Sequence, residues 1–443
     1  MSFLSLTDAD REAMLAEIGV DSVDELFRDI PAGVRFDGTL GLEPPLKEAE
    51  LQRHLEELAS RNVDTTRELS FLGAGIYDHY VPAISDAVLQ RGEFLTAYTP
   101  YQPEMSQGVL QAIFEYQTVI CELTGMDVSN ASGYDGTTVA ADACLIAKFA
   151  TGRSKVVLTE ATNPQVRQVV KTYARGFGLE VVEVPHRGGA TDPDELAAAS
   201  PDAAAVIFQQ PNFFGVLEPA PDLAAAATDA GALAVAHVDP MSLGVLEAPG
   251  AYGCAIAIGE GQGTGNYSAY GGPHYGFLAA RNEFIRRMPG RIIGETTDLN
   301  GERAYVLTLQ TREQHIRREK ATSNITTNQT LLALQGLVTL SWLGPHGVRE
   351  VGETCMSLAA YAQERLGIEL VFADRSTFKE FAVRVGRTAR DVIRDARARG
   401  VHPGYALGRD YEGLDDALLV CVTEKRTPAD IDRLAEVLHE VAA

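Results

Sequence analysis

The sequence predicts an α/β protein with a mostly parallel sheet that is covered by helices on both faces. Helical stretches such as residues 163–177 and 221–231 alternate with short apolar or β-branched runs. Strands that are apolar along their whole length and alternate with helices are typical of parallel sheets buried on both faces. The expected strands are KVVLT (155–159), LEVVEVP (179–185), AAVIFQQ (204–210), ALAVAHVD (232–239), CAIAIG (254–259) and YGFLAAR (275–281).

Before this alternation the sequence predicts a helical arm. Residues 7–19 begin with a capping threonine and carry apolar residues at helical spacing, and residues 22–30 and 46–62 have similar patterns. Such an arm either wraps a partner subunit or packs on the chain's own core, and both interpretations are open. We assign the arm to residues 1–65.

After about residue 320 the alternation is replaced by a smaller α+β pattern. A long helical region, residues 328–366, is interrupted at the sequence GPHG, and a strand, a helix and a second strand follow. A closing helix begins after a cap at Thr427. Beyond the arm, the expected domains are therefore a large domain at residues 66–320, and a helical connection with a small C-terminal domain at residues 321–443.

The chain of 443 residues is strongly acidic, with 38 Lys and Arg, 61 Asp and Glu, and a formal net charge of −23. A surface of this sign repels nucleic acid, so a nucleic-acid binder is disfavoured. Lysine supplies only 7 of the basic residues, and arginine supplies the other 31. Abundant acid with scarce lysine is what a salt-rich cytoplasm favours, because salt screens the self-repulsion. A halophilic host is therefore our hypothesis.

The five cysteines predict a reducing compartment. They are odd in number, widely spaced and set among apolar residues, as expected of small buried hydrophobic side chains. No cysteine lies at metal-ligand spacing from a histidine, so no metal is expected.

The N-terminal sequence has neither a targeting signal nor an apolar stretch of the ~18 residues that a membrane span needs. We expect a cytoplasmic protein that binds no membrane.

The loop SGYDGTT (132–138) leads directly into a predicted helix and is one candidate binding site. Free N–H groups at a helix N-terminus can hold a phosphate, and the small residues Gly136 and Thr137 allow close approach. The alternative is a glycine-rich entry to a packed helix. Asp135 favours this alternative, because its carboxylate would repel a phosphate.

A second candidate site lies where the predicted strand 232–239 ends in His237 and Asp239. Ligands of open α/β sheets bind at the carboxyl ends of strands, where an acid can pair with a heterocyclic nitrogen and a histidine can stack. A satisfied core histidine is the commoner case. The glycine-rich stretch GEGQGTGNYSAYGGP (259–273), with Asn266 at its centre, predicts either a close approach to a ligand or a flexible surface loop.

A third candidate is the loop at residues 98–104, which precedes a predicted amphipathic helix. Two prolines stiffen this loop, and stiff loops suit the wall of a pocket or an interface. The alternative is a structural turn that packs its tyrosines inward. The residues that the loop would present are Tyr98, Thr99, Tyr101, Gln102 and Glu104.

Five long motifs follow one another along the chain: FLGAGIYDHYVPA, FLTAYTPYQPEMSQG, SGYDGTTVAADA, QQPNFFGVLE and GGPHYGFLAAR. Together they resemble the glycine decarboxylase P-protein family of the glycine cleavage system. The resemblance is to the N-terminal half of that protein, which in many prokaryotes is a separate alpha chain, subunit 1. It implies the fold-type I architecture of pyridoxal-phosphate (PLP) enzymes, with a large sheet domain and a small C-terminal domain.

The resemblance also implies that the chemistry depends on one lysine. PLP enzymes hold the cofactor as a Schiff base on a lysine downstream of the acid that pairs with the pyridine nitrogen, here Asp239. No lysine occurs from Val238 through Glu319, and the glycine-rich segment around Asn266 lies where the family's other chain has its lysine. We therefore expect neither a catalytic residue nor a covalently bound cofactor in this chain. The expected remnants of a pocket are Asp135, Gly136, Thr137, His237, Asp239 and Asn266.

The resemblance thus implies a subunit of glycine dehydrogenase (aminomethyl-transferring) that is inactive alone. A homologous beta chain would carry PLP, glycine would lose its carboxylate as CO2, and the aminomethyl group would pass to the lipoyl arm of H-protein. The loop at residues 98–104 would form walls of a shared pocket. Two alternatives stay open. One is a complete PLP enzyme that uses Lys320 or another lysine, and the other is a scaffold homologue without a catalytic role.

If the acidic composition is an adaptation to salt, lowering the salt concentration will destabilise the fold. Charges are screened beyond about 3 Å at 1 M ionic strength but only beyond about 10 Å at 0.1 M. We expect the melting temperature, followed by circular dichroism, to fall as potassium chloride is lowered across this range. Sucrose at matched osmolality serves as the control, because it screens no charge. A melting temperature that does not change with salt would contradict the hypothesis.

Overall fold

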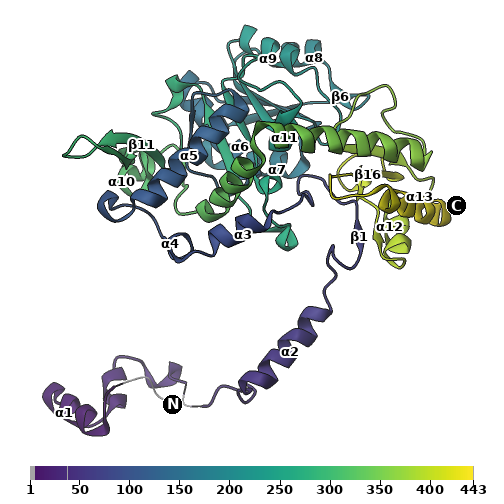
Figure 1. The fold of residues 1–443 in the computed structure, drawn as a ribbon. Coiled ribbons are helices and arrows are strands. Elements are labelled where there is room, and N and C mark those ends of the chain that lie inside the picture. Colours follow the sequence, from purple (N-terminus) through teal and green to yellow (C-terminus); the bar gives the residue numbers. More distant parts are fainter. Residues whose placement is uncertain (1–4, 37, 443) are drawn as a thin grey trace. The chain divides into compact units, whose positions relative to one another are not determined.

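The computed structural model describes residues 5–36 and 38–442, and the chain forms two compact units, Met1–Val63 and Asp64–Ala443 (Figure 1). The first unit contains the helices α1 (Asp8–Ile18) and α2 (Glu48–Ser60). Thr7 caps α1 by accepting a hydrogen bond from the Asp10 backbone N–H. The expected helix at residues 22–30 is only a short 3-10 helix, Val23–Phe27. None of the described residues in this unit is buried.

The second unit is built around a seven-stranded sheet with the order β2-β10-β9-β8-β7-β3-β4. Strands β3, β4, β7, β8 and β9 are parallel, whereas β10 is antiparallel to both of its neighbours. All six expected strands are present, and the mostly parallel sheet is confirmed. The bounds are β2 (Val128–Ser129), β3 (Lys155–Thr159), β4 (Glu180–Val184), β7 (Ala203–Gln210), β8 (Leu233–Val238), β9 (Ile256–Glu260) and β10 (Gly276–Ala280).

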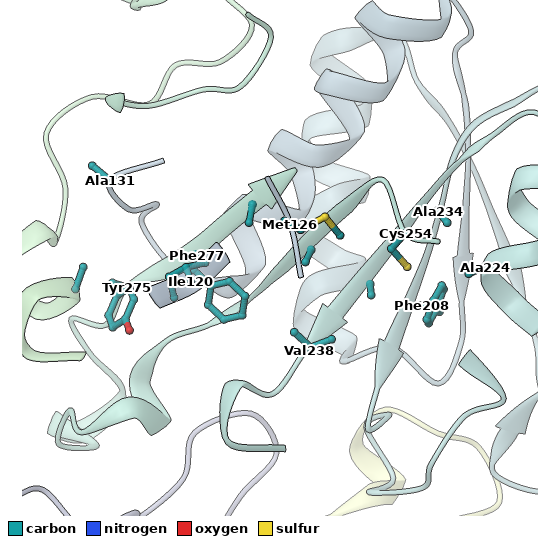
Figure 2. Packing of buried hydrophobic residues seen from close by; sticks show 14 of the residues in the cluster. Ile120, Met126, Ala131, Phe208, Ala224, Ala234, Val238, Cys254, Tyr275 and Phe277 are labelled. Atoms are coloured by element: carbon teal, nitrogen blue, oxygen red, sulfur yellow. The ribbon is translucent and has the colours of Figure 1, made fainter. Parts of the chain in front are cut away.

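Both faces of this sheet are buried, as the apolar runs predict. Along β7, Val206 and Phe208 point to one face, and Ala205 and Ile207 point to the other. The first face packs against α5, α8, α9 and the start of α11, and Figure 2 shows part of this cluster around Phe208. The second face packs against α6 and α7. The helix bounds are α5 (Gln107–Thr124), α6 (Gly136–Thr151), α7 (Pro164–Phe177), α8 (Pro193–Ala199) and α9 (Ala220–Asp229).

The long helix α11 (Thr330–Leu366) has a break at Gly344, where the sequence GPHG predicts an interruption. Gly344 has a φ of 61°, which favours glycine, and Pro345 follows without an N–H to donate. The C-terminal half of α11 shares a core with a three-stranded antiparallel sheet, β13-β16-β15, and with α12 and α13. The bounds are β13 (Glu380–Arg384), β15 (Tyr405–Ala406), β16 (Ala417–Cys421), α12 (Ala389–Arg397) and α13 (Pro428–Ala442).

Thr427 precedes α13 and accepts a hydrogen bond from the Asp430 backbone N–H, so the expected cap is confirmed. The expected division of the second unit at residue 320 stays a prediction. None of the helices in the described residues is long and apolar enough to cross a membrane. The remaining elements are α3 (Ala83–Leu89), α4 (Gly92–Leu95), α10 (Gln314–Arg317), β1 (Leu69–Ser70), β5 (His186–Arg187), β6 (Ala190–Thr191), β14 (Val401–His402) and an antiparallel hairpin of β11 (Ile292–Thr297) and β12 (Arg303–Thr308).

The order of the strands determines where a ligand site can form. The chain moves from β3 to β4 toward one edge of the sheet and then through β7, β8 and β9 toward the other. The direction reverses between β3 and β7. In open α/β sheets, a crevice forms outside the carboxyl ends of the strands at such a reversal.

Candidate functional site

A cavity of about 60 Å³ lies at the carboxyl ends of the central strands. Gln209 lines it from β7, His237 and Asp239 line it from the end of β8, and Glu260 lines it from the end of β9. Gly136 and Thr137 at the start of α6 complete it on another side. The tertiary structure therefore brings four of the predicted pocket residues, Gly136, Thr137, His237 and Asp239, to one place.

Asp239 uses both of its carboxylate oxygens inside the protein. Oδ1 accepts a hydrogen bond from the backbone N–H of Met241, two residues along the chain. Oδ2 lies 2.6 Å from the Nζ atom of Lys379, and both side chains are almost entirely buried. Asp239 is thus the acid at the end of a strand that the sequence predicts, but its counter-ion is a lysine of the same chain.

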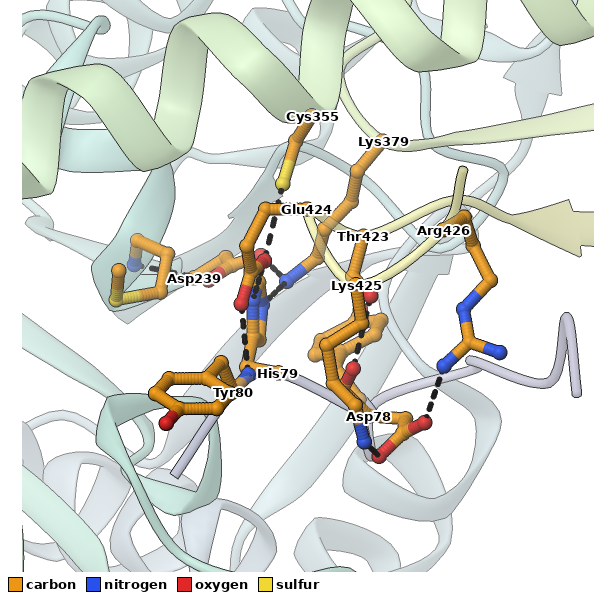
Figure 3. A network of polar contacts seen from close by, with 12 residues as sticks. Asp78, His79, Tyr80, Asp239, Cys355, Lys379, Thr423, Glu424, Lys425 and Arg426 are labelled. Carbon is orange, nitrogen blue, oxygen red and sulfur yellow. Dashed lines mark hydrogen bonds and ion pairs between the residues drawn. The ribbon is translucent and has the colours of Figure 1, made fainter. Parts of the chain in front are cut away.

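Lys379 has three partners for its three N–H bonds. Besides Asp239, the ammonium lies 2.8 Å from Nε2 of His79 (Figure 3). It also lies 3.4 Å from the centre of the Tyr77 ring. Burial by itself lowers the pKa of Lys379, but the Asp239 carboxylate raises it above its usual value. Lys379 is therefore charged at neutral pH, and contacts within the protein replace those that water would make with its three N–H groups.

The proton positions of His79 follow from this contact. An ammonium group can only donate, so Nε2 of His79 accepts and Nδ1 carries the ring proton. Nδ1 lies 2.6 Å from the Glu424 carboxylate and donates to it. Burial opposes ionisation of Glu424, but the interaction with His79 lowers its pKa to about 2.

His79, Cys355 and Glu424 are also the one group in the described part of the chain whose atoms are close enough to hold a metal ion together. Metal ligation needs a free lone pair on the imidazole nitrogen that faces the metal. Nδ1 of His79 carries a proton, because Nε2 accepts from Lys379. The group is therefore held by hydrogen bonds, with the Cys355 thiol 3.6 Å from the Glu424 carboxylate.

Two carboxylates occupy the N-terminus of α6, where a phosphate was one expectation. Asp135 accepts hydrogen bonds from the backbone N–H groups of Thr137 and Thr138, at 2.9 and 2.8 Å. Glu260 accepts from the backbone N–H of Gly136 at 2.9 Å. A Cβ at Gly136 would lie 2.7 Å from the backbone nitrogen of Glu260, so only glycine permits this approach. In the structure the loop at residues 132–138 is a glycine-containing entry to a packed helix, which was the alternative to a phosphate site.

His237 and Asn266 are buried and only partly satisfied. Burial lowers the pKa of His237 to about 4, so the ring is neutral at pH 7, and neither ring nitrogen has a partner in the described part of the chain. Asn266 is 3% exposed and donates from Nδ2 to the Leu332 carbonyl. Unlike His237, Asn266 does not line the cavity.

The loop at residues 98–104 points its tyrosines outward. Tyr98 is 78% exposed and Tyr101 is 44% exposed, so the alternative of an inward-packed turn is wrong. The loop borders a second cavity, of about 140 Å³. The polar side chains that line this cavity include those of Tyr98, Thr99 and Arg291. The Arg291 guanidinium donates to the Tyr101 hydroxyl. Gln102 and Glu104 are exposed and do not line this cavity.

Sequence reasoning missed Lys379, His79 and Glu260. His79 is 300 residues from Lys379 along the chain, and no spacing rule connects such positions. One signal was present. Lys379 and Glu380 interrupt the apolar strand TFKEFAVRV, and a strand inside a core rarely carries charges without partners.

The fold places the chain among proteins with the fold-type I architecture of PLP enzymes. A sphingosine-1-phosphate lyase of Burkholderia pseudomallei has the same fold at 16% identity, with a TM-score of 0.67 over 93% of this chain and 94% of that one. The predicted fold class is therefore confirmed.

Within this class the chain belongs to the glycine cleavage system P-protein family, whose model matches residues 1–438. A probable glycine dehydrogenase (decarboxylating) subunit 1 from Moorella thermoacetica is 49% identical over 448 residues and matches along 100% of both chains. A crystal structure of a glycine decarboxylase P-protein in inhibitor-bound form is 42% identical, with a TM-score of 0.91 and full coverage of both chains. The identification as a P-protein subunit is confirmed.

The residues of this chain do not fit PLP, the cofactor of that class. Asp239 is paired with Lys379, and the backbone N–H groups at the start of α6 that would face a phosphate already donate to the side chains of Asp135 and Glu260. No lysine follows β8 until Lys320. The cavity of about 60 Å³ is also less than half of the roughly 150 Å³ that holds a benzene ring in an engineered protein core.

The state of Glu260 predicts a pH dependence of stability. Burial raises the pKa of Glu260 to about 8, although the N–H groups of Gly136 and Gln262 favour the carboxylate. The unfolded chain ionises this group near pH 4, so the unfolded state loses the proton first as pH rises, and stability falls between about pH 5 and pH 8. Below pH 4 both states are protonated and the effect is absent.

Glu260→Gln should remove this loss, because an amide has no proton to lose. We expect the free energy of unfolding of the variant, measured with urea, to exceed that of the unmodified chain by a few kcal/mol more at pH 8 than at pH 5. Glu350→Gln, at an exposed glutamate of α11, is the matched control and should change nothing. Parallel pH profiles for Glu260→Gln and the unmodified chain would show that Glu260 ionises normally.

Proposed function

We propose that this chain is the alpha subunit of a two-chain glycine decarboxylase and that the PLP of the assembled enzyme is bound by a homologous beta chain. The observation that carries the proposal is the pocket itself, in which the acid for the ring nitrogen is paired with Lys379. The relatives named subunit 1 imply a second subunit. In this proposal the chain alone is inactive.

The proposed reaction uses glycine and the lipoyl arm of H-protein. PLP on the beta chain would supply the electron sink that lets glycine lose its carboxylate as CO2, and the aminomethyl group would then pass to the lipoyl sulfur. The residues of this chain would shape and close the pocket. They would also exclude water from it, which strengthens the polar contacts inside.

We propose that the loop at residues 98–104 provides these contacts, through Tyr98, Thr99, Tyr101, Gln102 and Glu104. Large exposed aromatic side chains are enriched where proteins meet a partner. The loop combines highly exposed Tyr98 with the neighbouring Met105, which is 80% exposed. Its backbone is stiffened by Pro100 and Pro103, so the side chains are preorganised.

The alternative of a complete PLP enzyme has less support. Lys320 is exposed and does not line the cavity at the strand ends. Lys379 does reach that region, but its Nζ binds the acid that a ring nitrogen would need. The reactive carbon of PLP lies at the opposite end of the ring from that nitrogen, so Lys379 is in the wrong place for the imine.

We also propose that the protein works in a cytoplasm, and in one rich in salt. All five cysteines are free, which agrees with a reducing compartment. Four of them are buried and Cys121 is half-buried. The scarcity of lysine supports the salt-rich host.

Mixing the purified chains tests the assignment. We expect exchange of labelled CO2 with the glycine carboxyl only when this chain, the beta chain and H-protein are combined. Borohydride reduction of the mixture should add the mass of the cofactor to the beta chain alone. Equal exchange rates with and without this chain would contradict the proposal. Addition of the cofactor mass to this chain after borohydride reduction would favour a complete PLP enzyme.

Replacing Tyr98 tests the role of the loop. We expect Tyr98→Ala to lower kcat/KM of the assembled pair by on the order of tenfold to a hundredfold, because a central aromatic anchor at an interface is worth about 2 kcal/mol or more. Tyr361→Ala removes a partly exposed tyrosine of α11 and is the control, with unchanged activity. Full activity of Tyr98→Ala, with assembly confirmed by ultracentrifugation, would favour a scaffold role.

A further inference from the structure

Lys379 lies at the start of the small C-terminal sheet, and its side chain extends to Asp239 at the end of β8 in the large sheet. It immediately precedes β13, and its carbonyl accepts a hydrogen bond from the Val422 backbone N–H. The residue before it, Phe378, donates its backbone N–H to the Gly215 carbonyl, in the segment that follows β7. The backbone at Lys379 is thus bound on both sides, and the side chain is directed toward the end of β8.

Both members of the Lys379–Asp239 pair have several contacts inside the chain. The ammonium contacts Asp239, His79 and the Tyr77 ring, and the second Asp239 oxygen accepts from Met241. Lys379 is 2% exposed and the side chain of Asp239 is 9% exposed. The three N–H positions of the ammonium are therefore used, and each carboxylate oxygen has one partner inside the chain.

This arrangement reproduces one bond of a cofactor. A protonated pyridine nitrogen presents a single N–H⁺ to a carboxylate at hydrogen-bond distance. Nζ of Lys379 likewise presents a positively charged N–H donor to Oδ2 of Asp239.

The same contact region joins segments that are far apart in sequence. Asp78, beside His79, forms ion pairs with Lys425 and Arg426, at 2.7 and 2.6 Å. Thr423 donates from its hydroxyl to the Asp78 carbonyl (Figure 3). The segment at residues 77–80 therefore lies between the end of β8 and the loop after β16. Lys379 contacts the first through Asp239 and the second through the backbone of Val422.

We propose that Lys379 is the internal replacement for a cofactor in this chain. Its ammonium takes the position of a ring nitrogen at Asp239 and fixes the small C-terminal sheet to the large sheet without any ligand. The inference goes beyond the proposed function, since it concerns the stability and ligand binding of this chain alone.

The variant Lys379→Ala leaves Asp239 buried without a counter-ion. We expect it to melt well below the unmodified chain. n-Propylammonium chloride should raise its melting temperature by restoring the ammonium, and pyridoxine, which has the ring nitrogen but no phosphate, should do the same at a pH where that nitrogen is protonated. Sodium chloride at equal ionic strength is the control. Neither probe should move the melting temperature of the unmodified chain.

A double-variant cycle keeps the test decisive if Lys379→Ala does not fold. Asp239→Asn and Lys379→Met each break the pair, whereas the double variant removes both charges and fills the space. Removal of both partners of a buried ion pair costs far less than removal of one. We therefore expect the double variant to melt above either single variant.

Three outcomes would overturn the proposal. The first is a double variant that is no more stable than the single variants. The second is a melting temperature that n-propylammonium chloride or pyridoxine shifts equally in all variants, or that neither probe shifts in a folded Lys379→Ala variant. The third is an unmodified chain that retains PLP after gel filtration. Because these measurements use neither the beta chain nor glycine, a failure of the exchange reaction would leave the inference standing.

Discussion

The buried ion pair of Lys379 and Asp239 is the interaction on which the site depends. Taking each charge out of water costs several kcal/mol. This cost is offset only if the two ions form a close pair and also make hydrogen bonds to other groups. Here both conditions hold, since Asp239 caps its own turn and Lys379 also contacts His79 and Tyr77. The positions of the segment at residues 77–80 and of the start of β13 follow from these contacts.

The same logic governs the other end of the cavity. Free N–H groups at a helix N-terminus need an acceptor, which a ligand phosphate or a protein carboxylate can supply. In this chain Asp135 and Glu260 supply it. The strand ends and the helix start are where α/β sheets bind ligands, yet their polar groups are mostly used internally. His237, buried beside the cavity, is the exception, since neither of its ring nitrogens has a partner among the residues that the structure describes.

The elements with a strong local pattern were predictable. The strands from β3 to β10 that the sequence predicts are apolar runs that match the observed bounds within two residues, because a parallel sheet buries both faces. The hairpin of β11 and β12 was missed, since its strands, IIGETT and RAYVLT, carry polar residues and neither is apolar throughout. The antiparallel direction of β10 was missed as well, because the apolar pattern of a strand does not encode its direction.

The sequence by itself determined the family and the absence of a lysine between Val238 and Glu319, because both are properties of residue order alone. It also placed Asp239 at the end of a strand. Only the tertiary structure decided that Lys379 lies on that acid and that Glu260 lies on the start of α6. These contacts join residues more than a hundred positions apart, and they depend on the order of strands in the sheet and on the path of the chain between the two sheets, which no local periodicity specifies.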